Sequence, residues 1–153
     1  MSNDFERMVN EIQESIMEDA RRTYSEKVIE RWLNPRNLGE IRNADGFAKI
    51  KGPCGDTMQI SFKVKDHRIS EIRFTTDGCA SSIAAGSMAT ELAQGNKLEE
   101  AAQIDQQMIL EGLGGLPEES VHCALLASST LKEAIKSYFD SKKNNPAKQR
   151  HNE

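Results

Sequence analysis

The stretch MQISFKVKDHRISEIRFTT, residues 58–76, decides the fold. Its first half alternates between apolar and polar side chains, as expected of a half-buried strand. The apolar positions are Met58, Ile60, Phe62 and Val64. The polar run at 65–68 predicts a hairpin loop, and residues 69–76 are predicted to form the return strand.

A third strand is predicted on the N-terminal side of this hairpin. Asn43, Asp45 and Gly46 mark a turn, and the residues that follow it, 47–51, favour a short strand. The three segments together predict a three-stranded antiparallel meander.

Helical spacing is predicted on the C-terminal side of the hairpin. The predicted helical segments are 81–94, 98–103, 105–111 and 122–138. Gly95 is expected to end the first of them in a left-handed conformation. Gly112, Gly114, Gly115 and Pro117 predict a flexible loop before the last helix. The polar residues 141–153 lack an apolar face, and we expect them to be disordered.

Another helix is predicted before the sheet. Thr23 and Glu26 have the spacing of a capping box, so a helix is expected to start at Thr23. It would carry Val28, Ile29 and Trp32 inward and end before Pro35.

The N-terminal segment 4–20 has the spacing of an amphipathic helix. Its apolar stripe consists of Phe5, Met8, Val9, Ile12 and Ile16. We expect this stripe to pack on its own domain; a partner helix in a homodimer and a lid over the site are the alternatives. The predicted fold class is therefore α+β, with a helical extension (1–22), one sheet-and-helix domain (23–142) and a flexible tail (143–153).

Composition excludes several classes of protein. The chain has 153 residues, with 20 Lys and Arg against 24 Asp and Glu, and a net charge of -4 argues against a strong nucleic-acid binder. No stretch approaches the roughly 18 uninterrupted apolar residues that a membrane span needs. The N-terminal residues show no export or import signal. Three cysteines cannot all pair internally, so we expect no disulfide framework and a cytoplasmic location.

The cysteines are placed where a metal-binding sulfur is expected. Cys54 lies in a predicted loop, and Cys79 and Cys123 lie at predicted helix starts, where the helix dipole favours thiolate. Asp56 and His122 are adjacent oxygen and nitrogen donors. Three thiolates with one Asp or His suit zinc or an iron–sulfur cluster. Without a Cys-x-x-Cys pair, the site requires the fold to bring distant loops together.

The order of several motifs resembles the iron–sulfur cluster assembly scaffold family, the IscU proteins and the N-terminal domain of NifU. The motifs are Tyr24-Ser25-Glu26-Lys27-Val28-Ile29, Asn34-Pro35-Arg36-Asn37, Cys54-Gly55-Asp56, Asp77-Gly78-Cys79-Ala80-Ser81-Ser82 and His122-Cys123-Ala124-Leu125-Leu126-Ala127. The resemblance covers roughly residues 24–142.

The resemblance implies a scaffold or carrier that is not itself an enzyme. Cys54, Cys79 and Cys123 would bind a transient [2Fe-2S] cluster or accept persulfide sulfur. Asp56 and His122 match the family's other site residues. We expect Asp56 to be the exchangeable ligand and His122 to be an alternative ligand or proton acceptor. Zn(II) would suit the same donors.

The implied partners are a cysteine desulfurase and apo iron–sulfur acceptor proteins; a frataxin-like protein and a ferredoxin are further candidates. No nucleic acid or membrane partner is expected. The loop 116–120 reads Leu-Pro-Glu-Glu-Ser, where many family members have Leu-Pro-Pro-Val-Lys, so binding of an Hsp70 chaperone is in doubt.

Two other functions stay open. One is a zinc-bound persulfide acceptor of the SufU type, although the chain has His122 and no obvious insertion between Cys79 and Cys123. The other is a domain in which zinc only supports folding.

Overall fold

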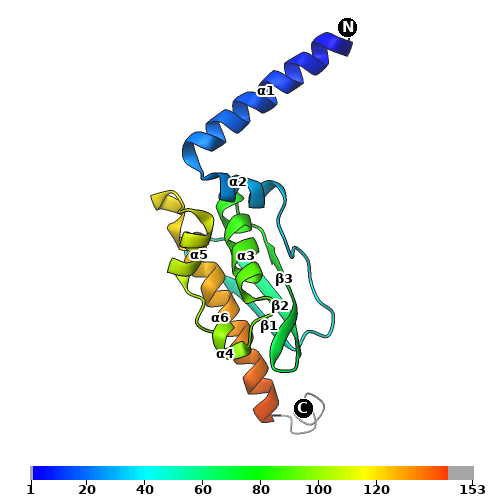
Figure 1. The fold of residues 1–153 in the computed structure, drawn as a ribbon, viewed down its shortest axis with the longest axis vertical. Coiled ribbons are helices and arrows are strands. Elements are labelled where there is room, and N and C mark those ends of the chain that lie inside the picture. Colours follow the sequence, from blue (N-terminus) through cyan, green and yellow to red (C-terminus); the bar gives the residue numbers. More distant parts are fainter. Residues whose placement is uncertain (1, 145–153) are drawn as a thin grey trace.

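The computed structural model describes residues 2–144 as a sheet covered by helices, with one further helix extending from it (Figure 1). The elements are α1 (Ser2–Thr23), α2 (Glu26–Leu33), β1 (Gly46–Lys51), β2 (Thr57–Lys65), β3 (Arg68–Thr76), α3 (Ala80–Ala93), α4 (Leu98–Ala101), α5 (Gln106–Leu113), the 3-10 helix η1 (Glu118–Ser120) and α6 (Val121–Asn144). The predicted α+β class is confirmed.

The sheet is the predicted antiparallel meander, with strand order β1-β2-β3. Ile60 in the middle of β2 lies opposite Ala48 on one side and Phe74 on the other. Asp66 and His67 connect β2 to β3 with positive φ angles of 56° and 64°. Positive φ at both central residues matches the twist of a two-residue hairpin. The hairpin therefore has the position that the polar run predicted.

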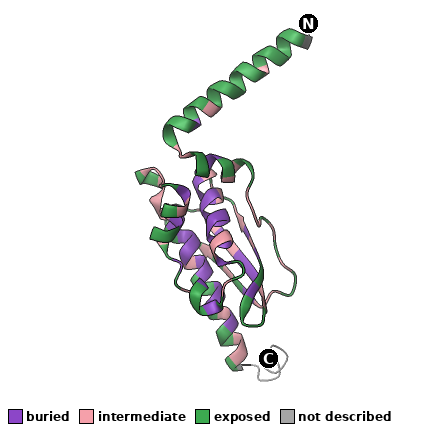
Figure 2. Cartoon of the chain, in the orientation of Figure 1, coloured by how far each residue is buried: buried purple, intermediate pink, exposed green. Residues whose placement is uncertain are grey.

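The core lies between one face of the sheet and the helices α3 and α6 (Figures 1 and 2). Met58, Ile60 and Phe62 are fully buried on this face, in agreement with their alternation in sequence. The Phe62 ring packs against Tyr138 of α6 with 6.2 Å between ring centroids. The apolar period of β2 therefore determines which face of the sheet the helices cover.

Small residues let α3 lie close to the sheet. A side-chain carbon at Gly86 would come within 2.4 Å of the Phe74 ring, so only glycine fits there. Ala84, Ala85 and Ala89 of the same helix are also fully buried. Although α3 is rich in apolar residues, no helix in the range 2–144 has the length and apolarity to cross a membrane.

The start of α2 differs from its prediction. Ser25, not Thr23, is the N-cap, and its hydroxyl accepts a hydrogen bond from the backbone N–H of Val28 at 3.1 Å. Thr23 instead ends α1 and donates its hydroxyl to the carbonyl of Asp19. A hydroxyl two residues later serves the cap equally well, and sequence alone did not separate the two. Trp32, predicted to point inward, is only half-buried.

Two boundaries near the C-terminus also differ. Gly112 belongs to α5, and the left-handed C-cap is Gly114, with φ 72°. Helix α6 continues to Asn144, so the prediction of disorder is wrong for residues 141–144. The remainder of the predicted tail, 145–153, lies outside the described residues. The division into an extension, a domain and a tail stays a prediction.

Helix α1 has the predicted period but not the predicted packing. It extends away from the domain and contacts it through α2 (Figure 1). Phe5 and Ile16 of its stripe are 64% and 53% exposed. The expectation that the stripe packs on its own domain is therefore wrong. At the elbow between the helices, Ile16, Met17, Trp32 and Leu33 line an apolar pocket together with Gln13.

Candidate metal centre

The topology brings the candidate ligands to one end of the sheet. Cys54 and Asp56 lie in the β1–β2 loop, and Cys79 is the N-cap of α3, directly after β3. In a meander, the β1–β2 turn and the C-terminal end of β3 lie at the same end of the sheet. Cys123, in the first turn of α6, lies at this same end of the sheet. The predicted convergence of distant loops is therefore a consequence of strand order.

Three donor atoms come close together. One carboxylate oxygen of Asp56 and the sulfurs of Cys79 and Cys123 all lie within 4.8 Å of one another. Ligand atoms around a tetrahedral metal are about 3.3 to 3.8 Å apart, given metal–ligand distances of about 2.0 to 2.3 Å. A small contraction would thus let these donors hold one ion. The donor set fits zinc or the iron of a cluster.

The sulfurs differ strongly in their surroundings. Cys79 is exposed, whereas Cys123 is buried. Burial raises the pKa of the Cys123 thiol to about 11, and the charges of Cys79, Asp56 and Cys54 act in the same direction. A hydrogen bond from Ser82 opposes these effects. The helix dipole was expected to favour thiolate at Cys123, and this is wrong for the metal-free chain because desolvation dominates.

The other two predicted site residues lie at the margin of this group. Cys54 is exposed, and its sulfur is not one of the three converging atoms. Its loop is held by a 2.7 Å hydrogen bond from the Gly52 N–H to the Asp56 carbonyl. The Nε2 atom of half-buried His122 lies 3.7 Å from the Cys123 sulfur. The structure therefore gathers three of the five predicted residues and leaves Cys54 and His122 beside them.

Sequence reasoning did not identify two residues that shape the site. The buried hydroxyl of Ser82 donates to Asp56 Oδ2 at 2.9 Å and reaches Cys123 Sγ at 3.4 Å. A side-chain carbon at Gly78 would lie 2.4 Å from Ser82 Oγ and 2.7 Å from Asp56 Oδ2. The signal for Ser82 was its position three residues after Cys79, which puts both on one face of a helix start.

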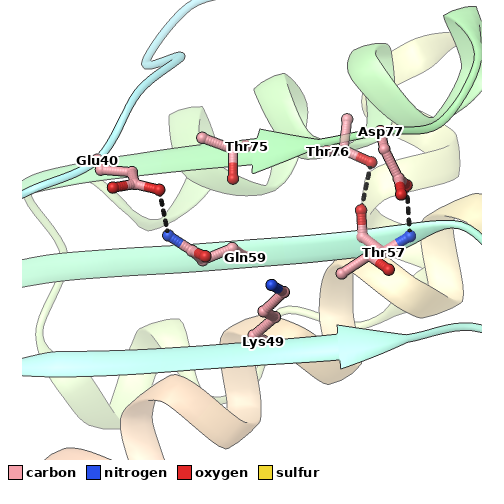
Figure 3. Close-up of a pocket in the computed structure, with 7 residues that line it drawn as sticks. All are labelled: Glu40, Lys49, Thr57, Gln59, Thr75, Thr76 and Asp77. Carbon is pink, nitrogen blue, oxygen red and sulfur yellow. Dashed lines mark hydrogen bonds between the residues drawn. The ribbon is translucent and has the colours of Figure 1, made fainter.

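A hydrogen-bonded clasp joins two of the ligand loops on the outer face of the sheet (Figure 3). The carboxylate of Asp77 accepts the backbone N–H of Thr57 at 2.7 Å, and the Thr76 hydroxyl donates to the Thr57 carbonyl at 2.7 Å. Thr57 follows Asp56, and Asp77 precedes Gly78 and Cys79. The clasp therefore limits how far the two loops can separate.

These hydrogen bonds border a polar pocket of about 340 Å³ that contains none of the candidate ligands (Figure 3). Its lining residues are Glu40, Lys49, Thr57, Gln59, Thr75, Thr76 and Asp77. Lys49, Gln59 and Thr75 are cross-strand partners on the face of the sheet opposite the buried residues of β2, so this part of the pocket is separate from the core.

Comparison with known proteins gives consistent matches. Residues 23–145 match the family described as NifU-like N terminal domain. The chain is 50% identical over 117 residues to the iron-sulfur cluster assembly scaffold protein IscU 1 of Archaeoglobus fulgidus, and the match covers 76% of each chain. It is 44% identical over 120 residues to IscU of Escherichia coli K12, which covers 75% of this chain and 93% of that one.

Solved structures agree with the fold. A protein assigned to iron-sulfur cluster scaffolding in the SUF system, FiSufU of Fervidobacterium islandicum AW-1, superposes with a TM-score of 0.60 and 25% identity. The superposition covers 73% of this chain and 96% of that one.

Proposed function

The chain belongs to the family of NifU-like N-terminal domains, and from this premise we propose that it is a scaffold on which iron–sulfur clusters are assembled. The resemblance inferred from the ordered motifs is confirmed. One observation of the structure carries the proposal. Two thiols and a carboxylate from the β1–β2 loop and the starts of α3 and α6 converge within 4.8 Å.

We assign the ligands as follows. Cys54, Cys79 and Cys123 would hold the nascent [2Fe-2S] cluster, because thiolate is the ligand such clusters prefer. Asp56 would occupy the fourth position. Carboxylate oxygen is a harder donor than thiolate and suits iron less well within a cluster, so this position would exchange most readily. His122 is the alternative ligand, or accepts a proton when Cys123 is deprotonated.

The exposure of the donors suits a cargo that must leave. Cys54 and Cys79 are exposed, whereas Cys123 is buried. A cluster held by these residues would have one side on the core of the domain and the other open to an acceptor. Apo iron–sulfur proteins could therefore attack it from outside without unfolding the scaffold.

Electron balance defines the partners that the reaction needs. A cysteine desulfurase would supply sulfur as persulfide: a scaffold thiolate attacks the outer sulfur, the donor's S–S bond breaks, and the desulfurase thiolate leaves. Each transferred sulfur takes up two electrons to become sulfide, whereas each ferrous iron that becomes ferric supplies one. An outside electron donor such as a ferredoxin must provide the difference. A frataxin-like protein is the candidate regulator of this step.

The three unpaired thiols suit the reducing cytoplasm. Glu118 and Glu119 are exposed at η1, directly before α6. Because these acids replace a proline and a valine of many relatives, and Ser120 replaces a lysine, we expect an Hsp70 chaperone to bind this loop poorly.

A zinc-bound persulfide acceptor of the SufU type is the second candidate. The observation that favours it is the donor set itself, because two thiols and a carboxylate with a third thiol nearby also suit tetrahedral zinc. A purely structural zinc is less consistent with the fold. The core between the sheet, α3 and α6 is a large apolar cluster, and Cys123 is the only one of the three cysteines within it.

Anaerobic reconstitution tests these functions. The protein supplied with ferrous iron, cysteine, a cysteine desulfurase and a reductant such as reduced ferredoxin should acquire the optical and Mössbauer spectra of a [2Fe-2S] cluster and transfer it to an apo-acceptor protein. Cys54→Ser, Cys79→Ser and Cys123→Ser should each abolish stable cluster formation. His122→Ala tests whether His122 acts as an alternative ligand or proton acceptor. Its matched control is His67→Ala, in the exposed hairpin turn. Persulfide turnover with zinc retained and no cluster would support the SufU-type function, and tight zinc without sulfur acceptance would leave only a structural role.

A further inference from the structure

Ser82 joins two candidate ligands, one in the β1–β2 loop and one at the start of α6. It lies in the first turn of α3, three residues after Cys79, and is fully buried. Its Oγ atom lies 2.9 Å from Asp56 Oδ2 and 3.4 Å from Cys123 Sγ. These partners are 26 and 41 residues away in sequence. One hydroxyl thus links the β1–β2 loop to the start of α6.

The two acceptors compete for a single proton. A serine hydroxyl has one hydrogen to donate, and the shorter distance to the carboxylate favours Asp56. A hydrogen bond to a charged carboxylate is also stronger than one to sulfur. The hydroxyl therefore holds one oxygen of Asp56 and remains close enough to turn toward Cys123 when that oxygen moves away.

The backbone at Gly78 confines this arrangement. The space that a side chain would need at Gly78 is already occupied by Ser82 Oγ and Asp56 Oδ2. The carboxylate and the hydroxyl are therefore packed against backbone as well as against each other. This contact leaves the Asp56 side chain few alternative positions near Cys79 and Cys123.

We propose that Ser82 is a positioning residue that holds the Asp56 carboxylate toward Cys79 and Cys123, so that this ligand is already in place when a metal arrives. The inference rests on the proposed function, since it makes Ser82 the residue that sets how readily the exchangeable ligand binds. Ser82 does not contact the cargo itself. It acts through Asp56, as hydrogen-bond partners of metal ligands generally do.

The test is titration of the metal-free chain with Co²⁺, whose absorption bands report thiolate coordination without any cluster assembly. Ser82→Ala should weaken Co²⁺ affinity roughly tenfold, as expected for loss of a hydrogen bond that orients a ligand. The chain offers a matched control. Ser81 is the neighbouring residue on the same helix and is also fully buried, but its hydroxyl has no partner among residues 2–144. Ser81→Ala should leave Co²⁺ affinity unchanged.

A double-mutant cycle separates positioning from a general effect on structure. If Ser82 acts through Asp56, Ser82→Ala should have no further effect on Co²⁺ affinity in an Asp56→Ala background. Equal losses in both backgrounds would overturn the proposal, as would unchanged Co²⁺ affinity in Ser82→Ala. Thermal unfolding of Ser82→Ala beside Ser81→Ala shows whether the variants fold equally well.

The Co²⁺ measurement is independent of the proposed function. If wild-type chain binds Co²⁺ but never assembles a cluster, the scaffold function fails while the role of Ser82 in ligand positioning stands. If clusters form and Ser82→Ala retains both wild-type Co²⁺ affinity and wild-type cluster lifetime under a chelator, the scaffold function stands and the role of Ser82 is wrong.

Discussion

The segments that carry the candidate ligands and helix α1 differ in how the rest of the chain determines their positions. The segments that carry Asp56 and Cys79 are irregular in sequence, yet backbone and side-chain hydrogen bonds hold them against the domain. Helix α1 has a regular helical pattern in the sequence, yet most of its apolar stripe is exposed (Figure 2). A strong local pattern therefore predicts an element, whereas contacts with distant residues determine where it lies.

The difference has an energetic basis. Isolated helices gain little stability from propensity, and most helical stability in proteins comes from packing an apolar face. In α1 that face meets little of the domain, whereas the donor loops contact α3, α6 and the sheet. Changes at the site should therefore have large effects inside the domain, and changes in α1 should have almost none.

The reactivity of the three thiols should show the largest effect. A pKa of about 11 for Cys123, against an ordinary value of 9.0, leaves on the order of a hundredfold less thiolate near neutral pH, since each pKa unit is a factor of ten. Alkylation of metal-free chain followed by mass spectrometry should modify Cys54 and Cys79 first and Cys123 last. The Cys123 rate should rise with pH, because deprotonation supplies the reacting thiolate.

Deletion of residues 2–22 provides the control, since it should leave all three alkylation rates unchanged. Equal rates at Cys54, Cys79 and Cys123 would show that Cys123 is as accessible to the reagent as an exposed residue. The stated difference between the candidate site and α1 would then be wrong.

Gly78→Ala should produce the next largest effect. The added carbon would meet the Ser82 side chain at 2.4 Å and Asp56 at 2.7 Å, so the loop or the helix start must move. Overpacking of this kind costs about 1 to 3 kcal/mol of the free energy of unfolding. Urea denaturation measures this loss, and Co²⁺ titration should show weakened binding in the same variant.

Gly52→Ala is the matched control for Gly78→Ala in the neighbouring loop. Its added carbon would meet Leu126 at 3.4 Å, a distance that small adjustments accommodate. If the two variants had equal stability and equal Co²⁺ affinity, the site would be far more tolerant than its contacts indicate.

Asp56→Ala should have a smaller effect than Gly78→Ala. It should lengthen the lifetime of a bound cluster, whereas Gly78→Ala should weaken metal binding. If the carboxylate is the exchangeable ligand, its removal closes the easiest route for an acceptor to displace a donor. The cluster should then persist several-fold longer during transfer to an apo-ferredoxin, measured by absorption and circular dichroism. A lifetime no longer than that of wild type would rule out Asp56 as the labile position.

Much of the domain could be predicted from sequence because its signals are local. Met58, Ile60 and Phe62 alternate, and each is buried on the face that the alternation predicts. The role of Ser82 could not be predicted in this way, because it depends on contacts with Asp56 and Cys123, which lie in distant parts of the sequence. The burial of Cys123 raises the pKa of its thiol, whereas the helix dipole would lower it. This burial likewise follows from packing of α6 against α3 and the sheet.

The errors at helix ends have a similar cause. Thr23 and Ser25 are both competent N-caps; in the structure Ser25 caps α2, and its hydroxyl also donates to the Leu113 carbonyl, a contact that local sequence does not reveal. That contact joins residues 88 positions apart. The exposure of α1 is the complementary case, in which the sequence predicts the helix but the described chain offers no surface that covers its stripe.

Deletion of residues 2–22 should have the smallest effect on the domain itself. Because α1 contacts little besides α2, the truncated chain should retain its unfolding midpoint within about 2 °C and its full Co²⁺ affinity. Thermal unfolding and Co²⁺ titration of the full-length and truncated chains measure both quantities. A large loss of stability would mean that α1 packs on the domain in solution after all.

Size-exclusion chromatography with light scattering then tests what covers the stripe. If α1 pairs with a second copy, the full-length chain should have the mass of a dimer and the truncated chain that of a monomer. Ile12→Glu, which places a charge in the stripe, should behave like the truncation, whereas Glu11→Gln on the polar face should behave like wild type. Monomers throughout would rule out the dimer, and α1 would then be a helix whose apolar face has no partner in a second copy of the chain.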